Sequence, residues 1–526
     1  METDINWLDL SDRVWKLILS NLNYKSLLNA SGTCKKFNVL LAMSQRLMKK
    51  LSLQIGNPFG ERFETVLDKE NAYDEYLYEL KLMKECLQKS ERKYDSIIIW
   101  VLKDRAPENY IMYYLIFEIL KQLVESVDQI TFFRTPLQDD NFFKVIQILK
   151  NLKVLKFKEY GDDYLKQTKT VTNIVRPNNV SLINEISIIE VGKKFSFEML
   201  YLFDTITTLK VSVCVSTIFK GITMEGDPPF DYETFHSFLL KQKCLKVLHL
   251  KNLRSLFKSD KLSYNFRFSL DELFLDSVYW TSNNNAIMFF NKQTELKKVQ
   301  LTLKHFEPVS YKLCFNDLII QLFGKNDHLK TVVLSTCASN GYNIVDFSFL
   351  EGIVNLSVEN LDLDLFPSQN VTKLIDAFTK LFPNVKSLTY GIVNEDDHGL
   401  NQIQNWKSLE SIKCYQTNIN KFLEHINVGE KLTTCTINCT HVIRIKRPIL
   451  MQFLTRHQNI KYFSSNTPAF KKYLDEDLSI IVKDLKKIQY QGNSLSNYLT
   501  KKEFLVKLFE KIQSIYILTS IWSIDR

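Results

Sequence analysis

Residues 245–250 read LKVLHL, a hexad with apolar side chains at its first, fourth and sixth positions. Alternation of apolar and polar residues over so short a run is typical of a strand with one buried face. Related hexads occur elsewhere, for example at 152–157 and 296–301. We number the positions of each hexad from its first apolar residue.

Sixteen such hexads follow one another at intervals of 23 to 39 residues. They open at Tyr94, Val127, Leu152, Ile183, Ile206, Leu245, Leu270, Leu296, Leu329, Val358, Val385, Leu409, Leu432, Ile460, Leu485 and Ile512. With 45% hydrophobic residues, about 9% of positions match the hexad by chance, so a single copy means little. The ordered spacing is harder to explain by chance, and helix-like segments such as 371–382 lie between hexads. We therefore predict a repeat protein of alternating strands and helices.

The hexads and the segments between them resemble leucine-rich repeats, in which each hexad is a short strand and the following segment returns as a helix. The resemblance implies an α/β fold, a solenoid with parallel strands inside and helices outside. No single repeat buries both of its faces, so neighbouring repeats must stack. We expect about sixteen divergent repeats over residues 94–526, after a helical linker at 51–93.

A different pattern occupies residues 8–40, LDLSDRVWKLILSNLNYKSLLNASGTCKKFNVL. Val14, Ile18 and Leu22 fall on one helical face, and Leu27 belongs to an apolar surface that continues through two more short helices. A segment of about forty residues cannot bury all of that surface by itself. The pattern therefore predicts that something else covers it.

The order and spacing of these residues resemble an F-box, here assigned to a helical domain at residues 1–50. The family pattern has a leading Leu, an Ile-x-x-x-Leu helix, a Leu-Leu pair and a Cys-x-x-aromatic ending. The resemblance implies docking of apolar side chains onto a Skp-family adaptor. The residues that it implies for adaptor binding are Leu10, Val14, Ile18, Leu22, Leu27, Leu28, Cys34 and Phe37.

Through the Skp adaptor and a cullin, the resemblance implies a substrate-recognition subunit of a ubiquitin ligase, with a protein substrate on the concave solenoid face. Such a subunit acts by proximity and is not itself an enzyme. Two alternatives stay open. One is a protein-interaction scaffold with a degenerate F-box, because Ser11, Arg13 and Phe37 replace the usual Pro, Glu and Trp. The other is a helical cap on the domain that follows.

The composition is that of a globular chain, with 45% of its 526 residues hydrophobic and 24% charged. Nine cysteines without a C-x-x-C pair fit reduced thiols better than disulfides or zinc ligands. The longest apolar run, 110–120, is too short to cross a bilayer, and the first residues lack a basic-then-apolar signal. We expect a cytoplasmic or nuclear protein without membrane contact.

Sequence motifs for catalysis are missing. The phosphate-binding and dinucleotide glycine patterns, H-E-x-x-H and G-x-S-x-G do not occur. Adjacent acids, as at 139–140 and 396–397, point apart more often than together, and the eight histidines form no ligand pattern. We therefore predict no catalytic residues, no metal and no cofactor.

Position 2 of the hexad is lysine in seven copies. These are Lys153, Lys246, Lys297, Lys330, Lys386, Lys461 and Lys486. One interpretation is a basic strip that attracts an acidic or phosphorylated partner, and the other is a solvated column that keeps the strands soluble. The net charge of +9 is spread thinly, so a nucleic-acid partner is not expected. The candidate substrate-binding residues are His249, Phe274, Lys153, Lys246, Lys297 and Lys330.

Overall fold

The structure is a computed structural model whose described residues fall into two compact units. It describes residues 12, 15–16, 19, 22, 27, 35–44, 47, 51–55, 69–90, 92–100, 109–133, 139–158, 178–191, 195, 197, 200–213, 232–253, 265–276, 283–304, 320, 322–324, 326–337, 351–364, 371–392, 398–416, 419–426, 428–438, 446–465 and 487–490. The first unit comprises residues 1–253 and 265–268, and the second comprises 254–264 and 269–526. Both are mixed α/β.

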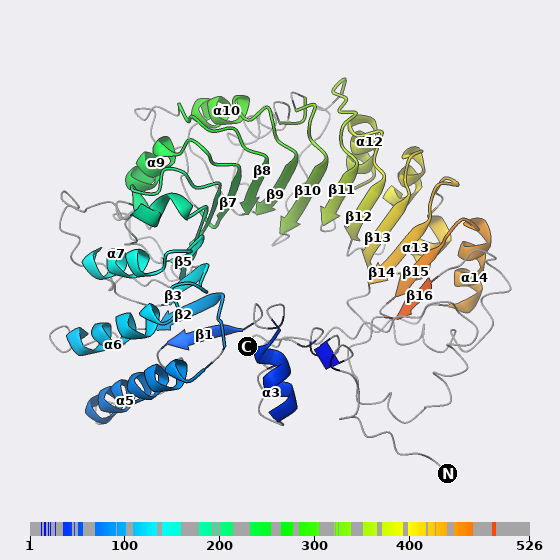
Figure 1. Ribbon diagram of the computed structural model, residues 1–526. Coiled ribbons are helices and arrows are strands. Elements are labelled where there is room, and N and C mark those ends of the chain that lie inside the picture. Colours follow the sequence, from blue (N-terminus) through cyan, green and yellow to red (C-terminus); the bar gives the residue numbers. More distant parts are fainter. Residues whose placement is uncertain are drawn as a thin grey trace, which may run out of the picture. The chain divides into compact units, whose positions relative to one another are not determined.

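In the first unit, the strands pair in chain order and each is parallel to the next. They are β1 (Ser52–Ile55), β2 (Ser96–Trp100), β3 (Gln129–Phe133), β4 (Val154–Lys158), β5 (Glu185–Val191), β6 (Thr208–Val213) and β7 (Val247–Lys251). The helices are α3 (Lys35–Ala42), α5 (Lys69–Gln88), α6 (Asn109–Lys121), α7 (Asp139–Ile148), the 3-10 helix η3 (Asn178–Leu182) and α9 (Tyr232–Lys241). Helices α5, α6, α7 and α9 lie on one side of the strands (Figure 1).

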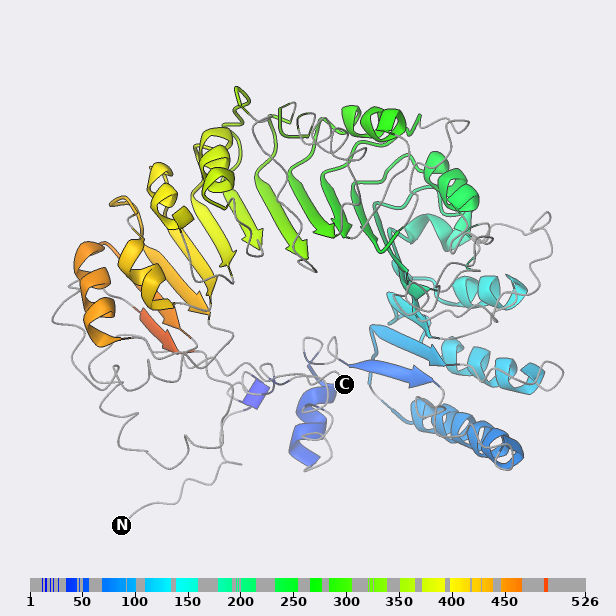
Figure 2. The ribbon, with the colours of Figure 1, turned by 180° about the vertical axis from the view of Figure 1, so that it is seen from behind.

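The second unit repeats this arrangement, again with parallel neighbours in chain order. Its strands are β8 (Glu272–Asp276), β9 (Lys298–Lys304), β10 (Thr331–Cys337), β11 (Asn360–Asp364), β12 (Ser387–Ile392), β13 (Ser411–Gln416), β14 (Thr434–Asn438), β15 (Tyr462–Ser465) and β16 (Lys487–Tyr490). Its helices are α10 (Asn283–Asn291), α12 (Val371–Leu381), the 3-10 helix η6 (His398–Asn405), α13 (Ile419–His425) and α14 (Arg447–Arg456). These helices also share one side of their strands (Figure 2). In each unit we call the opposite side of the strands the open face.

Strands β2 to β16 each begin at position 3 of a predicted hexad, which confirms fifteen of the sixteen predicted strands. The hexad at Ile512 lies outside the described residues. In the hexad of β4, the apolar positions 1, 4 and 6 (Leu152, Leu155 and Phe157) are buried, whereas positions 3 and 5 are half-buried on the open face. The repeated parallel strands are consistent with a leucine-rich-repeat-like solenoid.

The segment predicted as a helical linker, 51–93, contains a strand as well as a helix. Strand β1 pairs in parallel with β2, while α5 occupies the second half of the segment. The sequence pattern did not reveal β1 because Lys50 stands where the other hexads have an apolar residue. Parallel pairing in the first unit therefore begins at Ser52, and not at residue 94.

Phenylalanine rings fill the space between strands and helices in the first unit. The Phe157 ring of β4 lies 5.8 Å from the Phe142 ring of α7, and the Phe197 ring lies 4.8 Å from the Phe235 ring of α9. Further ring contacts join Phe157 to Phe195 and Phe195 to Phe197. Aromatic pairs of this kind each add about 0.5–1.5 kcal/mol beyond their buried area. A continuous aromatic core therefore joins β4 to α9.

Buried side chains three residues before position 1 join successive repeats by hydrogen bonds. Asn326 accepts a hydrogen bond from the Leu296 N–H at 3.3 Å. Asn355 donates to the carbonyl oxygens of Phe323 at 2.8 Å and Asn326 at 2.9 Å. Because these backbone groups lie where a helix turns back to a strand, the side chains satisfy atoms that the strand ladder does not reach.

Replacing Asn355 should weaken the second unit. Asn355 is 4% exposed, so Asn355→Ala removes two buried hydrogen bonds. It leaves the Phe323 carbonyl oxygen without this donor, while the Asn326 carbonyl oxygen keeps the Leu329 N–H, so the free energy of unfolding should fall by about 1–3 kcal/mol. Asn384→Ala is the matched control, since Asn384 makes a single bond to the Leu356 carbonyl oxygen and is exposed. Urea unfolding measures both variants. Equal losses in the two would contradict the proposed role of burial.

The second unit should also lose stability in mild acid. Burial lowers the pKa of His457, whose ring lies 4.8 Å from that of Phe453. A hydrogen bond that the ring donates to the backbone of Ile426 opposes this shift, and the positive charge of Arg456 adds to it. The pKa of His457 is thus lower in the folded chain than in the unfolded chain, where it is about 6.5. As the pH drops through that value, the unfolded chain binds a proton before the folded chain does, so the free energy of unfolding falls.

Thermal unfolding at about pH 7.5 and about pH 5 tests this expectation. The wild-type second unit should melt lower at the acid pH, and His457→Gln should reduce the difference because it removes the titrating group. An unchanged difference in the variant would show that other groups cause the effect.

Candidate protein-interaction sites

A small apolar core holds the F-box-like segment together. Its buried members are Leu19, Leu27, Leu40, Leu41, Leu47 and Leu51, with Trp15, Leu22, Phe37 and Tyr94 packed against them. The rings of Trp15 and Phe37 have centroids 4.5 Å apart. Tyr94 is position 1 of the first predicted hexad, and Leu51 directly precedes β1. The core of the segment is therefore continuous with the first strands.

The described adaptor-binding candidates lie within or beside this core. Leu27 is 0% exposed, and its side chain lies inside the core of the segment. Leu22 and Phe37 are half-buried and keep part of their surface accessible. The candidates Leu10, Val14, Ile18, Leu28 and Cys34 lie outside the described residues.

Two apolar side chains at α3 face solvent instead of the core. Val39 is 45% exposed and Met43, four residues on, is 73% exposed. Spacing of four places them on the same side of the helix. Arg92 donates a hydrogen bond to Asn38, which links α3 to the residues before β2. The F-box pattern did not reveal Val39 and Met43 because neither residue belongs to it. Their spacing of four residues is visible in the sequence.

The lysine column at position 2 forms a regular backbone ladder. The Lys330 N–H donates to the Lys297 carbonyl oxygen at 2.8 Å, and the Glu359 N–H donates to the Lys330 carbonyl oxygen at 3.0 Å. In the second unit, acids pair with the lysines: Lys297 with Asp271 at 3.5 Å, and Lys330 and Lys386 each with Glu359 at 3.3 Å. These pairs hold the pKa of Glu359 low, chiefly through the hydrogen bond from Lys330. The candidates Lys297 and Lys330 therefore do not form a free basic strip.

The remaining substrate-binding candidates occupy two separate units. Lys153 and Lys246 are exposed beside β4 and β7, and neither has an ion-pair partner within the part of the chain that the structure describes. His249 lies at position 5 of β7, and Phe274 lies at position 5 of β8, each half-buried between two buried neighbours of its strand. His249 belongs to the first unit and Phe274 to the second, so the structure does not define one site containing both.

A charged cluster that the sequence analysis did not single out lies on the open face of β4 to β6. Register places Lys156, Ser187 and Lys210 side by side on adjacent strands. The Lys210 ammonium donates to Glu185 Oε1 at 2.8 Å, and the Ser187 hydroxyl donates to the same oxygen at 3.1 Å. Burial raises the pKa of Glu185, but these hydrogen bonds and the positive charges outweigh it and leave the pKa low.

Lys156 has no such partner among the residues that the structure describes. No carboxylate among the described residues lies within ion-pair distance of its ammonium group, although Glu185 is on the next strand. Burial lowers the pKa of Lys156, and the positive charge of Lys210 adds to that effect against the attraction of Glu185. The two lysines of this cluster can be found in the sequence, because both stand at position 5 of a hexad, in the hexads that open at 152 and 206.

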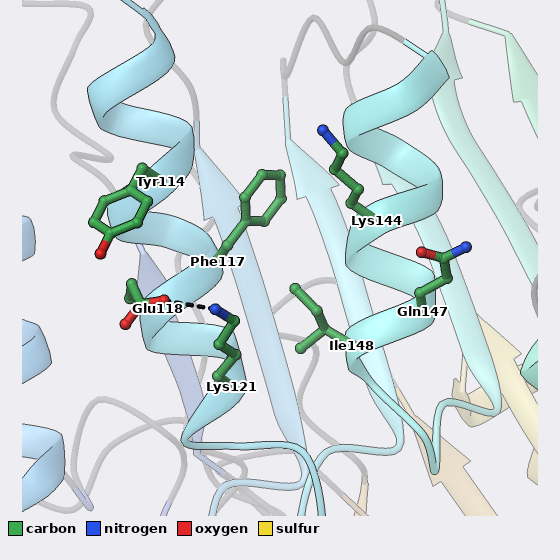
Figure 3. Close-up of a pocket in the computed structure, with 7 residues that line it drawn as sticks. All are labelled: Tyr114, Phe117, Glu118, Lys121, Lys144, Gln147 and Ile148. Carbon is green, nitrogen blue, oxygen red and sulfur yellow. Dashed lines mark hydrogen bonds and ion pairs between the residues drawn. The ribbon is translucent and has the colours of Figure 1, made fainter.

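A shallow groove of about 300 Å³ lies between α6 and α7 on the helical side of the first unit. It is lined by Tyr114, Phe117, Glu118, Lys121, Lys144, Gln147 and Ile148 (Figure 3). Lys121 donates to Glu118 at 2.7 Å, and Lys84 of α5 lies 3.5 Å from the same carboxylate. The hydrogen bond from Lys121 does most to lower the pKa of Glu118, which stays ionised at neutral pH. Glu118 is thus unsuited to donate a proton as a general acid.

Among the residues that the structure describes, no group of three or more His, Cys, Asp or Glu side chains is placed to hold a metal ion. None of the helices described above combines the length and apolar character needed to cross a membrane. Cys86 and Cys244 are exposed free thiols, and Cys414 and Cys435 are buried ones.

Comparison with protein families confirms the F-box prediction. The model of the F-box domain matches residues 7–49, within the predicted 1–50 domain. The leucine-rich-repeat families give no match, so the repeats rest on the hexads and the parallel strands. No curated protein matches the sequence of this chain. The chain thus contains an F-box domain followed by repeated parallel strands and helices.

Proposed function

We propose that this chain is a substrate-recognition subunit of a Skp–cullin–F-box ubiquitin ligase. The observation that carries the proposal is the F-box domain at residues 7–49, since F-box domains generally bind adaptors of the Skp type. The exposed Val39 and Met43 and the half-buried Leu22 and Phe37 support it, because they leave apolar surface uncovered beside a formed core. Leu10, Val14, Ile18, Leu28 and Cys34 complete the proposed adaptor surface.

The parallel strands and their helices form a leucine-rich-repeat solenoid in this proposal. Its open face binds a protein substrate, while the adaptor and cullin hold a ubiquitin-charged carrier nearby. Catalysis by the chain itself is not required, because holding a substrate lysine close to the carrier raises its effective concentration. The paired charges of the strand face, such as Lys330 with Glu359, suit a solvated binding surface.

Adaptor capture should depend on Val39 and Met43. Burying a methionine side chain contributes about 1.5–3 kcal/mol, whereas a buried unpaired carboxylate is costly, so Val39→Asp with Met43→Asp should abolish capture. Both residues are exposed in the free chain, and the double variant should therefore fold normally. Co-purification with a Skp-family adaptor measures the effect.

Met288→Asp is the matched control. Met288 is an exposed methionine of α10 in the second unit. The substitution therefore changes the same type of side chain at a position outside the F-box. It should leave capture intact. Normal capture by the folded Val39/Met43 variant would refute the proposed docking surface. Recovery of the adaptor without a cullin would favour an interaction scaffold over a ligase subunit.

A further inference from the structure

Charge is unevenly distributed along the strands of the first unit. Strands β4 to β7, each taken with the residue before it, carry six lysines and two glutamates, a formal charge of +4. Strands β8 to β15, taken in the same way, carry seven lysines and seven acids, a formal charge of zero. A local excess of positive charge thus lies on these four neighbouring strands, and it is not shared by β8 to β15.

We propose that these four strands bind an acidic, carboxylate-rich segment of the protein substrate. The basic patch consists of Lys153, Lys156, Lys158, Lys210, Lys246 and Lys251. This inference rests on the proposed function, because it names the class of substrate that the ligase subunit recruits.

The arrangement of the patch favours an extended segment. Four parallel strands about 4.8 Å apart span about 14 Å, and the five steps from Lys153 to Lys158 span about 16 Å. An extended chain advances about 3.3–3.6 Å per residue, so about five residues of a partner cover this area. Lys156, Ser187, Lys210 and His249 form one row across the strands by register. Within this row, Lys156 offers an ammonium group to a carboxylate of the partner, while Ser187 and Lys210 donate to Glu185.

Incomplete neutralisation within the patch is the strongest evidence for an anionic partner. The Lys210 ammonium is paired with Glu185, but half-buried Lys156 and exposed Lys153 and Lys246 have no carboxylate within ion-pair distance among the described residues. In the second unit, Lys297, Lys330 and Lys386 all have one. A bound carboxylate stabilises a half-buried ammonium group without a counter-charge more than an exposed one, since water screens the attraction between the two charges less there.

A protein segment fits this patch better than a nucleic acid does. Glu185 lies between Lys156 and Lys210, and a phosphate backbone would meet its negative charge in the middle of the patch. A peptide can place a neutral side chain or a donor opposite Glu185. The basic residues of the patch are all lysines, without the arginine fork that suits bidentate phosphate contacts.

Binding of a labelled peptide of alternating Glu and Ser, about ten residues long, tests the proposal on the full chain. The wild type should bind it, and raising the salt from about 0.1 M to about 1 M should abolish binding, because the screening length falls from about 10 Å to about 3 Å. Lys153→Glu with Lys246→Glu should weaken binding at least about tenfold, since each reversal replaces an attraction with a repulsion.

Lys330→Glu with Lys461→Glu is the matched control. These lysines are exposed, occupy the same hexad position and change the net charge equally, but they lie in the second unit. This variant should bind within about twofold of the wild type. Absence of wild-type binding, equal weakening in both variants, or tighter binding of a single-stranded oligonucleotide of the same charge would overturn the proposal.

The same variants separate this inference from the adaptor proposal. Lys153→Glu with Lys246→Glu should lose the peptide and still capture the Skp-family adaptor. Val39→Asp with Met43→Asp should lose adaptor capture and still bind the peptide. Absence of adaptor capture by the wild type would refute the ligase role but not peptide binding by the basic patch. Absence of peptide binding alone would refute only the proposal of an acidic substrate.

Discussion

Burial of the three apolar positions of each hexad between neighbouring strands is the constraint on which the rest of the structure depends. Leu152, Leu155 and Phe157 have no exposed surface, yet one strand and one helix cannot enclose them. Neighbouring strands and the helices on one side complete the enclosure. Because that packing uses positions 1, 4 and 6, positions 2, 3 and 5 are free to vary in charge without loss of the core.

The F-box domain depends on the same packing at its junction with the strands. Tyr94 packs against its core and Leu51 is part of that core, so the domain shares apolar side chains with the first strands. Exposed Val39 and Met43 remain outside this shared core. In our proposal, one surface binds an adaptor, while the open face of the strands binds a substrate. Both assignments require binding and orientation, and neither requires chemistry in this chain.

The sequence predicted most of the strands because apolar spacing alone defines them, whereas it could not reveal how charges pair. β1 was missed since Lys50 interrupts the pattern. Family spacing likewise could not reveal that Leu27 is fully buried in the core of the F-box-like segment. The pairing of Lys330 and Lys386 with Glu359 depends on register across repeats. Register also places Lys156 opposite Ser187 and not opposite a carboxylate of β5. Such differences follow from three-dimensional neighbours, which no single hexad specifies.

Hydrogen–deuterium exchange of the full chain, with and without a purified Skp-family adaptor, tests the central claim most directly. The account predicts slower exchange on adaptor binding at residues 35–44, which include α3, and unchanged exchange across β4 to β7. Adaptor binding that leaves 35–44 unchanged, or that protects β4 to β7 instead, would contradict the assignment of these two surfaces.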